Sequence, residues 1–170
     1  MTVGEKYRFQ VKRTVDPISL MRMSFGVAID QWRVHPDEWG SGWTPLGERA
    51  ASHFGQRLIK HQAMFAVQAL DHEDPHHFSS RRRAYKARVW DAVKYTFVSR
   101  RDNGSVGPAY AEFVGVFAAG GISRLWFPDR YHTVGWALEA GSTSLAIDVG
   151  MNELREFWPD IKTRVFHLKH

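Results

Sequence analysis

The densest group of side chains able to do chemistry lies in the run Asp-His-Glu-Asp-Pro-His-His at residues 71–77. Histidine and carboxylate groups are the usual protein ligands of zinc, iron and manganese. A metal ion here would be held by His72, Glu73, His76 and His77. Acidic residues at the end of a helix also oppose the helix dipole and attract a cation, which arginine supplies as well as a metal does. We therefore expect a capped, salt-bridged loop and no cofactor, with a divalent metal ion as the alternative.

A second group of polar side chains recurs every fourth residue after Pro45, at positions 49, 53, 57 and 61. Side chains at this spacing share one face of a helix. Together with nearby basic residues, they form a surface suited to the phosphates of lipid headgroups or nucleic acid. The candidate anion- or headgroup-binding residues are Arg49, His53, Arg57, Lys60, Arg81, Arg82 and Arg83. The alternative is a solvated face whose charges pair with the acids Glu153, Glu156 and Asp160.

Small residues recur at the same spacing in the last third of the chain. They are Ala111, Gly115, Ala119, Ala137 and Gly141. Small side chains four residues apart let two helices approach closely, in a membrane or in a soluble core. The acids Glu112, Glu139 and Asp148 interrupt these apolar runs, and a carboxylate in lipid would be costly. We therefore expect close packing in a soluble core, with the acids paired to arginines.

Helical periodicity and helix-start signals organise these groups into elements. Asp16-Pro17 and Thr44-Pro45 are each typical of a helix start, because the first residue caps the helix and the proline needs no hydrogen bond there. The expected helices cover residues 18–32, 46–70, 81–99, 109–126 and 132–158, the last capped by Thr133 and ended by Pro159. The predicted fold class is all-α, with about five helices and close-packed, Gly/Ala-rich C-terminal helices. The β-branched residues of Val93–Val98 leave a strand there, and so an α+β fold, as the alternative.

Length and composition bound the domain organisation and the function classes. A chain of 170 residues is typical of one domain. We expect a single helical domain at residues 16–161, an N-terminal extension at 1–15 and a basic C-terminal tail at 162–170. The absence of cysteine excludes disulfides, thiolate nucleophiles and cysteine-based zinc sites. The formal charge of +5 favours anionic partners, and the sequence contains neither a phosphate-binding loop nor a nucleophile elbow.

Several segments together resemble a known family. They are His72–Pro75, Tyr95–Gly104 and Asn152–Ile161, with Gly120–Ser123 and Phe127-Pro128 between the last two. They resemble a family of small uncharacterised bacterial cell-envelope proteins, over roughly Asp16–Ile161. The resemblance implies a place in the cell envelope, because members carry an N-terminal signal peptide, and it implies no activity. This sequence lacks such a leader and has His76-His77 where the family has an Arg-Tyr pair, so a cytoplasmic location stays the alternative.

The sequence thus favours a non-enzymatic helical protein that associates with a membrane surface or an envelope protein complex. The small-residue helices, the basic residues and seven tryptophans favour this hypothesis, since tryptophan suits positions that are wet on one side and apolar on the other. One alternative is a metal-dependent hydrolase centred on residues 72–77, with Glu73 as general base. Another is a nucleic-acid-binding protein that uses Arg49, Arg57 and the basic residues from Arg81 to Arg101. An oligomer is compatible with each hypothesis.

Overall fold

The computed structural model describes residues 1–76 and 85–165. Its first two helices, α1 (Val3–Val15) and α2 (Pro17–Arg33), meet at Asp16. Thr2 and Glu5 form a reciprocal capping box at the start of α1, and the Asp16 carboxylate accepts from the Ser19 amide to cap α2. The helix start at Asp16-Pro17 is thereby confirmed. The segment 1–15, expected above to be an N-terminal extension, contains α1, and α1 packs against α3.

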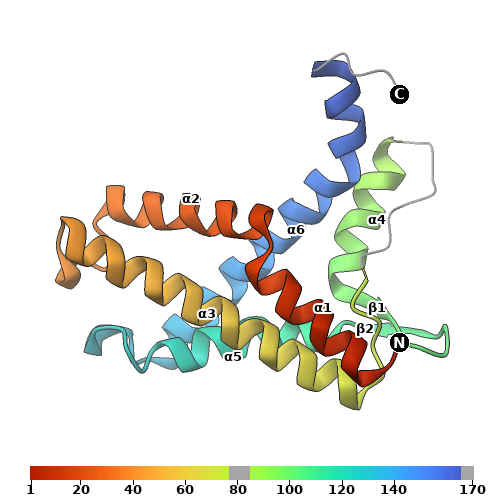
Figure 1. Cartoon of the computed structure of the whole chain (residues 1–170), viewed down its shortest axis with the longest axis horizontal. Coiled ribbons are helices and arrows are strands. Elements are labelled where there is room, and N and C mark those ends of the chain that lie inside the picture. The colour runs from red at the N-terminus through yellow and green to blue at the C-terminus, as the bar shows by residue number, and fades with distance from the viewer. Residues whose placement is uncertain (77–84, 166–170) are drawn as a thin grey trace.

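Helix α3 (Trp43–Leu70) is the central element and contacts α1, α2 and α5 (Figure 1). Its 28 residues span about 42 Å at the usual helical rise. A loop with the short 3-10 helix η1 (Asp37–Trp39) leads into it from α2. The predicted cap at Thr44 is wrong, because Gly42 takes the capping position and Thr44-Pro45 lies in the first turn, where proline is tolerated.

The middle of the chain contains both a helix and a strand, the two alternatives expected for it. Helix α4 (Tyr85–Phe97) contains most of the β-branched segment, and strand β1 (Val98–Arg100) begins directly after it. Strand β2 (Val106–Pro108) pairs with β1 antiparallel, with Val98 opposite Pro108. Two strands of three residues make no layer of their own, so the all-α fold class is confirmed for the described residues, which contain six α-helices.

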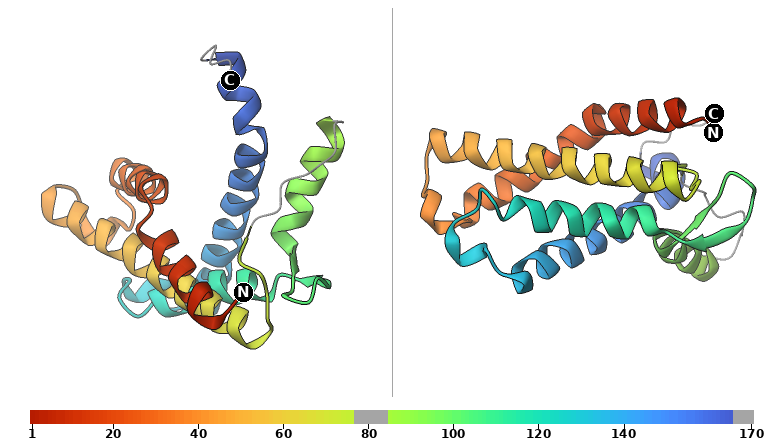
Figure 2. Two further views of the ribbon diagram at one scale, coloured as in Figure 1. Left: turned by 45° about the vertical axis from the view of Figure 1, so that its right-hand side comes forward. Right: turned by 90° about the horizontal axis from the view of Figure 1, so that it is seen from below.

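Helix α5 (Tyr110–Ser123) packs between α3 and α6 (Val134–Val165), with the 3-10 helix η2 (Asp129–Tyr131) in the connection (Figure 2). The close approach expected of these helices is confirmed. A Cβ added at Gly115 would lie 2.5 Å from Met64 Cγ on α3, and one at Gly120 would lie 2.7 Å from the Ala137 carbonyl on α6. Only glycine leaves room for the neighbouring helix at these two positions.

The start of α6 agrees with the sequence prediction, but its end does not. The Thr133 hydroxyl accepts from the Trp136 amide at 3.1 Å, as a cap does. Pro159 does not end the helix, which continues to Val165. Proline removes one helical hydrogen bond. On either side of it, Arg88 of α4 binds the carboxylates of Glu156 and Asp160, and these contacts with α4 help to hold the helix through the proline.

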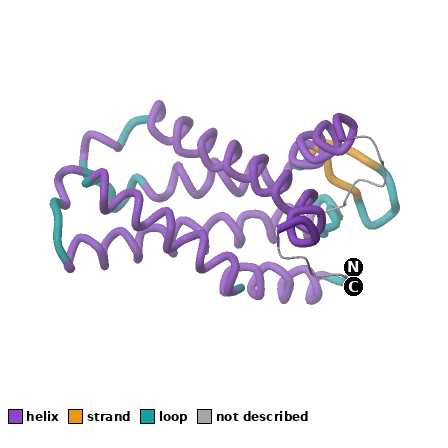
Figure 3. The backbone as a smooth tube through the Cα atoms, turned by 90° about the horizontal axis from the view of Figure 1, so that it is seen from above, coloured by secondary structure: helices purple, strands orange, loops and turns teal. Residues whose placement is uncertain are grey.

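The molecule has an elongated body and a raised arm. In Figures 1 and 3, α2, α3, α5 and the first part of α6 run along the body, and the β-hairpin lies at one end. The second part of α6 rises from the body beside α4. None of the described helices combines the length and apolarity needed to cross a membrane.

Candidate functional site

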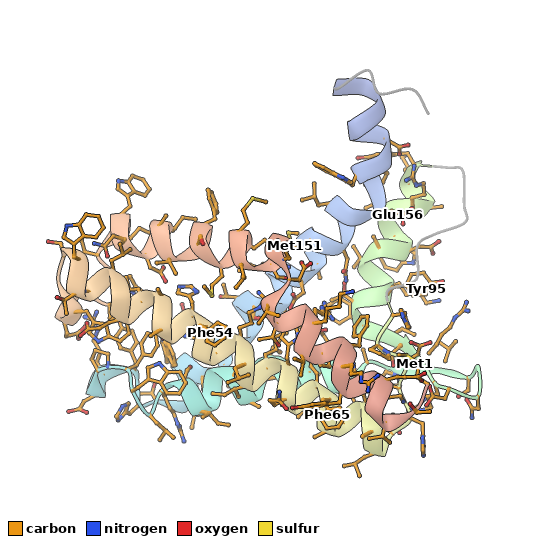
Figure 4. The ribbon with its side chains drawn as sticks, viewed as in Figure 1. Met1, Phe54, Phe65, Tyr95, Met151 and Glu156 are labelled. Carbon is orange, nitrogen blue, oxygen red and sulfur yellow. The ribbon has the colours of Figure 1, made fainter. Side chains whose placement is uncertain are left out.

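The outer side of α2 carries a stripe of large apolar side chains that are 36–83% exposed in the described structure. It consists of Met21, Phe25, Ile29 and Trp32, whose spacing places them on one face of the helix. Met21 and Phe25 are 68% and 69% exposed, and Trp32 is 83% exposed. Figure 4 shows side chains standing away from the body along this side of α2. We call these four residues the α2 stripe.

A helix on the surface of a soluble protein normally has one apolar stripe, which faces the core. Helix α2 already has such a stripe, with Val27 buried and Leu20 and Met23 half-buried against the body. The α2 stripe is therefore a second apolar face. Contiguous exposed apolar surface of this kind marks interaction sites, whereas single exposed apolar residues are ordinary.

The interior beneath α2 is unusually polar. Its fully buried apolar residues are mostly small, whereas long polar side chains such as Lys6, Gln10 and Arg49 are buried completely. Burying polar groups costs free energy unless each finds a partner. The buried polar residues of the described part are Lys6, Gln10, Thr14, Ser19, Arg49, Ser52, His61, Gln68, Glu73, Asp91, Thr96, Ser123 and Glu156.

The centre of this interior is a cluster of one lysine and two carboxylates from three helices. Lys60 of α3 lies 2.9 Å from Glu112 Oε1 of α5 and forms a short contact with Asp148 of α6. Burial opposes ionisation of Glu112, but the charges of Lys60 and Arg13 outweigh it and lower its pKa to about 2. Burial raises the pKa of Asp148, and the charge of Glu112 adds to that effect. The acids expected to pair with arginine thus pair with lysine, and the third, Glu139, is exposed.

The predicted anion-binding residues of α3 face the interior. Arg49 donates to the carbonyls of His35, Pro36 and Gly40, so it is the anchor of the loop between α2 and α3. His53 Nε2 lies 2.7 Å from an oxygen of Asp30 on α2. Arg49 therefore donates to partners inside the molecule, and the Nε2 atom of His53 is directed at α2.

Arg57, the next residue of this row, joins α3 to the junction of α1 and α2. Its guanidinium donates to the carbonyls of Arg13, Thr14 and Ser19 at 2.9–3.2 Å. Burial lowers its pKa to about 10, so it remains charged at neutral pH. The remaining predicted members, Arg81, Arg82 and Arg83, lie outside the described residues.

His61 closes the row and belongs to a hydrogen-bonded chain that ties α1 to α3. Its Nδ1 lies 2.9 Å from Gln10 Oε1, and the Gln10 amide donates to Gln68. Lys6 donates to the Gln68 carbonyl at 3.0 Å and forms an ion pair with Asp102 of the hairpin. Burial lowers the pKa of His61 to about 3, so it is neutral in the folded protein at neutral pH. Polar residues four apart on α1 are the sequence signal that could have shown its place in the body.

The predicted metal ligands that lie within the described residues, His72, Glu73 and His76, do not converge. Residues 72–76 have the His-Glu-x-x-His spacing by which a helix presents two zinc ligands. Here they follow the end of α3, and His72 has a left-handed backbone with a φ of 54°. His72 is exposed beside Asp102, while His76 contacts Asp74 at 2.7 Å.

Glu73, the proposed general base, is buried with 2% of its surface exposed. It accepts from the Ala111 amide at 3.2 Å, at the start of α5, where Ala109 in the capping position offers no side-chain acceptor. Burial raises the pKa of Glu73. No group of three metal-binding side chains occurs within residues 1–76 and 85–165, and His77 lies outside them. The metal hypothesis therefore stays a prediction without support from the described geometry.

Comparison with known proteins adds no family to this description. No family model, curated protein or solved structure matches the chain.

Proposed function

We propose that the chain is a non-enzymatic binding protein that docks peripherally on a membrane surface through the α2 stripe. One observation carries the proposal, namely four large apolar side chains aligned on one helix face, of which Met21, Phe25 and Trp32 are 68–83% exposed. Each large apolar side chain moved out of water contributes about 1.5–3 kcal/mol, so the stripe alone supplies enough free energy for reversible docking.

The composition of the stripe and its surroundings supports a membrane interface. Phenylalanine, methionine and a terminal tryptophan are residues that interfacial helices insert at the boundary between headgroups and acyl chains. Arg33 is exposed at the end of α2, and the chain as a whole carries a formal charge of +5. Anionic lipids attract basic residues near their surface by about 1 kcal/mol each. Docking against a protein complex on that membrane would use the same face.

Fractionation of native host cells tests where the protein docks. We expect it to sediment with membranes in low salt and to be released in part by a salt wash, since docking combines apolar and charge contacts. Retention through the salt wash, with loss on mild detergent, would indicate a protein complex. Recovery wholly in the soluble pool would overturn the proposal.

Flotation with vesicles tests the face. We expect M21S/F25S to lose most of its flotation with vesicles containing anionic lipid, because it removes two members of the α2 stripe. The matched control is L70S/L125S, whose side chains are at least as exposed but lie at the end of α3 and just after α5. Equal flotation of both variants would contradict docking through α2.

A further inference from the structure

A cavity of about 230 Å³ lies beneath α2, between it and the helices α3, α5 and α6. Basic side chains from three helices line it: Arg13 of α1, Arg22 of α2, and Arg57 and Lys60 of α3. Asp148 is the one acidic residue of its lining. A concave space with several convergent charged groups is the ordinary form of a small-ligand site.

Two of these four cations are already matched within the protein. Lys60 is paired with Glu112 and Asp148, and Arg57 donates to three backbone carbonyls. The guanidinium groups of Arg13 and Arg22 form neither a hydrogen bond nor an ion pair with a described residue, although the charges of Glu112 and Asp148 act on them from farther away. The lining therefore retains two guanidinium groups without a direct partner.

Half-buried, unmatched arginines are costly to the free protein. Both side chains are half-buried, and burial lowers the pKa of Arg22. The charge of Asp148 opposes this effect on the pKa of Arg22, whereas the charge of Arg13 adds to it, so the two guanidinium groups repel each other. A bound anion would replace the lost hydration with charge-assisted hydrogen bonds, which are roughly twice as strong as neutral ones.

The remaining lining indicates which anion fits. Ser19 and Ser144 add hydroxyl groups, whereas Met23, Val116 and Ile147 form an apolar wall. A second cavity of about 460 Å³ is also lined by Arg13 and Ser19. Its walls combine apolar residues such as Phe9 and Met64 with four acidic ones, and it gives the rest of a ligand room beyond the charged group. We propose that this cleft binds a phosphate monoester dianion carried on an apolar group, held by Arg13 and Arg22. We call it the Arg13/Arg22 cleft.

Calorimetric titration with hexyl phosphate and with inorganic phosphate tests the cleft. We expect saturable binding of one hexyl phosphate per chain, tighter than that of inorganic phosphate because of the apolar wall. R13Q/R22Q should weaken it by about tenfold or more, since two charge-assisted contacts are lost. The matched control R8Q/K86Q removes the same charge from exposed positions of α1 and α4 and should bind like the wild type.

Folding does not obscure the result. R13Q/R22Q removes guanidinium groups that have no direct partner, so its melting temperature without ligand should stay close to that of the wild type. Equal weakening in R13Q/R22Q and R8Q/K86Q would indicate general charge attraction and overturn the site. The absence of saturable binding in the wild type to both phosphates and to phosphatidate vesicles would overturn it as well.

Vesicles containing phosphatidate then identify the source of the phosphate. The cleft would be assigned to a lipid headgroup by two results together. R13Q/R22Q would lose binding to these vesicles, and the wild type would bind little free hexyl phosphate. Binding of free hexyl phosphate would assign it to a soluble ester. The M21S/F25S variant should still bind hexyl phosphate, so failure of the proposed docking function and failure of this cleft remain distinguishable.

Discussion

At the scale of single residues, the charged side chains of α3 have structural partners inside the molecule. Lys60 lies between two carboxylates, and Arg57 satisfies backbone carbonyls where α1 ends. A buried set of paired charges stabilises the fold little more than apolar side chains in the same positions would. Removal of one member is nevertheless destabilising, because it leaves the other charges buried without a partner. The structure therefore separates structural cations from the unmatched pair Arg13 and Arg22.

Lys60→Met should destabilise the protein by about 3 kcal/mol, because it leaves Glu112 and Asp148 facing each other without a counter-charge. Urea denaturation at neutral pH measures the change. Lys86→Met, at an exposed position of α4, is the control and should change stability by less than about 0.5 kcal/mol. A Lys60→Met variant as stable as this control would show that the two carboxyls share a proton already.

His61 should make the free energy of unfolding depend on pH. Its pKa is lowered from 6.5 to about 3 in the folded protein, so the unfolded chain binds the extra proton. The stability due to neutral His61 is present above pH 6.5 and is lost as pH falls from there toward 3, by about 2 kcal/mol between pH 7 and pH 5. His61→Gln should remove this part of the slope, and an unchanged slope would contradict the burial of a neutral histidine.

At the scale of elements, the packing of α5 against α6 depends on which of two adjacent glycines is substituted. A Cβ at Gly120 would meet the Ala137 carbonyl, whereas one at Gly121 would meet nothing within 4 Å. Gly120→Ala should therefore destabilise the protein by about 1–3 kcal/mol. Gly121→Ala should stabilise it by up to about 1 kcal/mol through helix propensity. Thermal unfolding of the two variants gives the comparison, and equal effects would argue against the close approach.

The helix starts and the small-residue packing could be predicted from the sequence because they depend on local chemistry. The caps at Asp16 and Thr133 satisfy amides a few residues away. The inward direction of Arg49 could not be predicted, since periodicity shows that residues share a face but not what that face contacts. The prediction that α6 ends at Pro159 failed for a similar reason. The contacts of Arg88 on either side of this proline come from a helix that is distant in sequence.

At the scale of the whole molecule, the described part buries many polar side chains and exposes many large apolar ones. Soluble proteins that act without a partner rarely show this distribution. An exposed apolar face is stable only when something covers it for part of the time, or when net charge keeps copies of the chain apart. The proposed docking of α2 on a membrane surface accounts for both the stripe and the positive charge.

Docking should change the environment of Trp32 without changing the fold. We expect a blue shift of tryptophan emission and reduced acrylamide quenching when the wild type meets anionic vesicles, because Trp32 leaves water. Trp32→Phe, which keeps an apolar ring, should still float with vesicles but lose most of the spectral change. Six other tryptophans remain, so an identical spectral change in that variant would place the contact elsewhere.

The hydrogen-bonded seam between α1 and α3 also determines how far these helices can slide. Lys6, Gln10 and Thr14 stand one turn apart on α1, and all three are buried. Leucines in such a seam would fit nearly as well after a shift of one turn, but Lys6 has its partners in Gln68 and Asp102 at one position only. These specific hydrogen bonds fix a single alignment of α1 against α3. They thereby also fix the position of Arg13, which lies on α1, in the Arg13/Arg22 cleft.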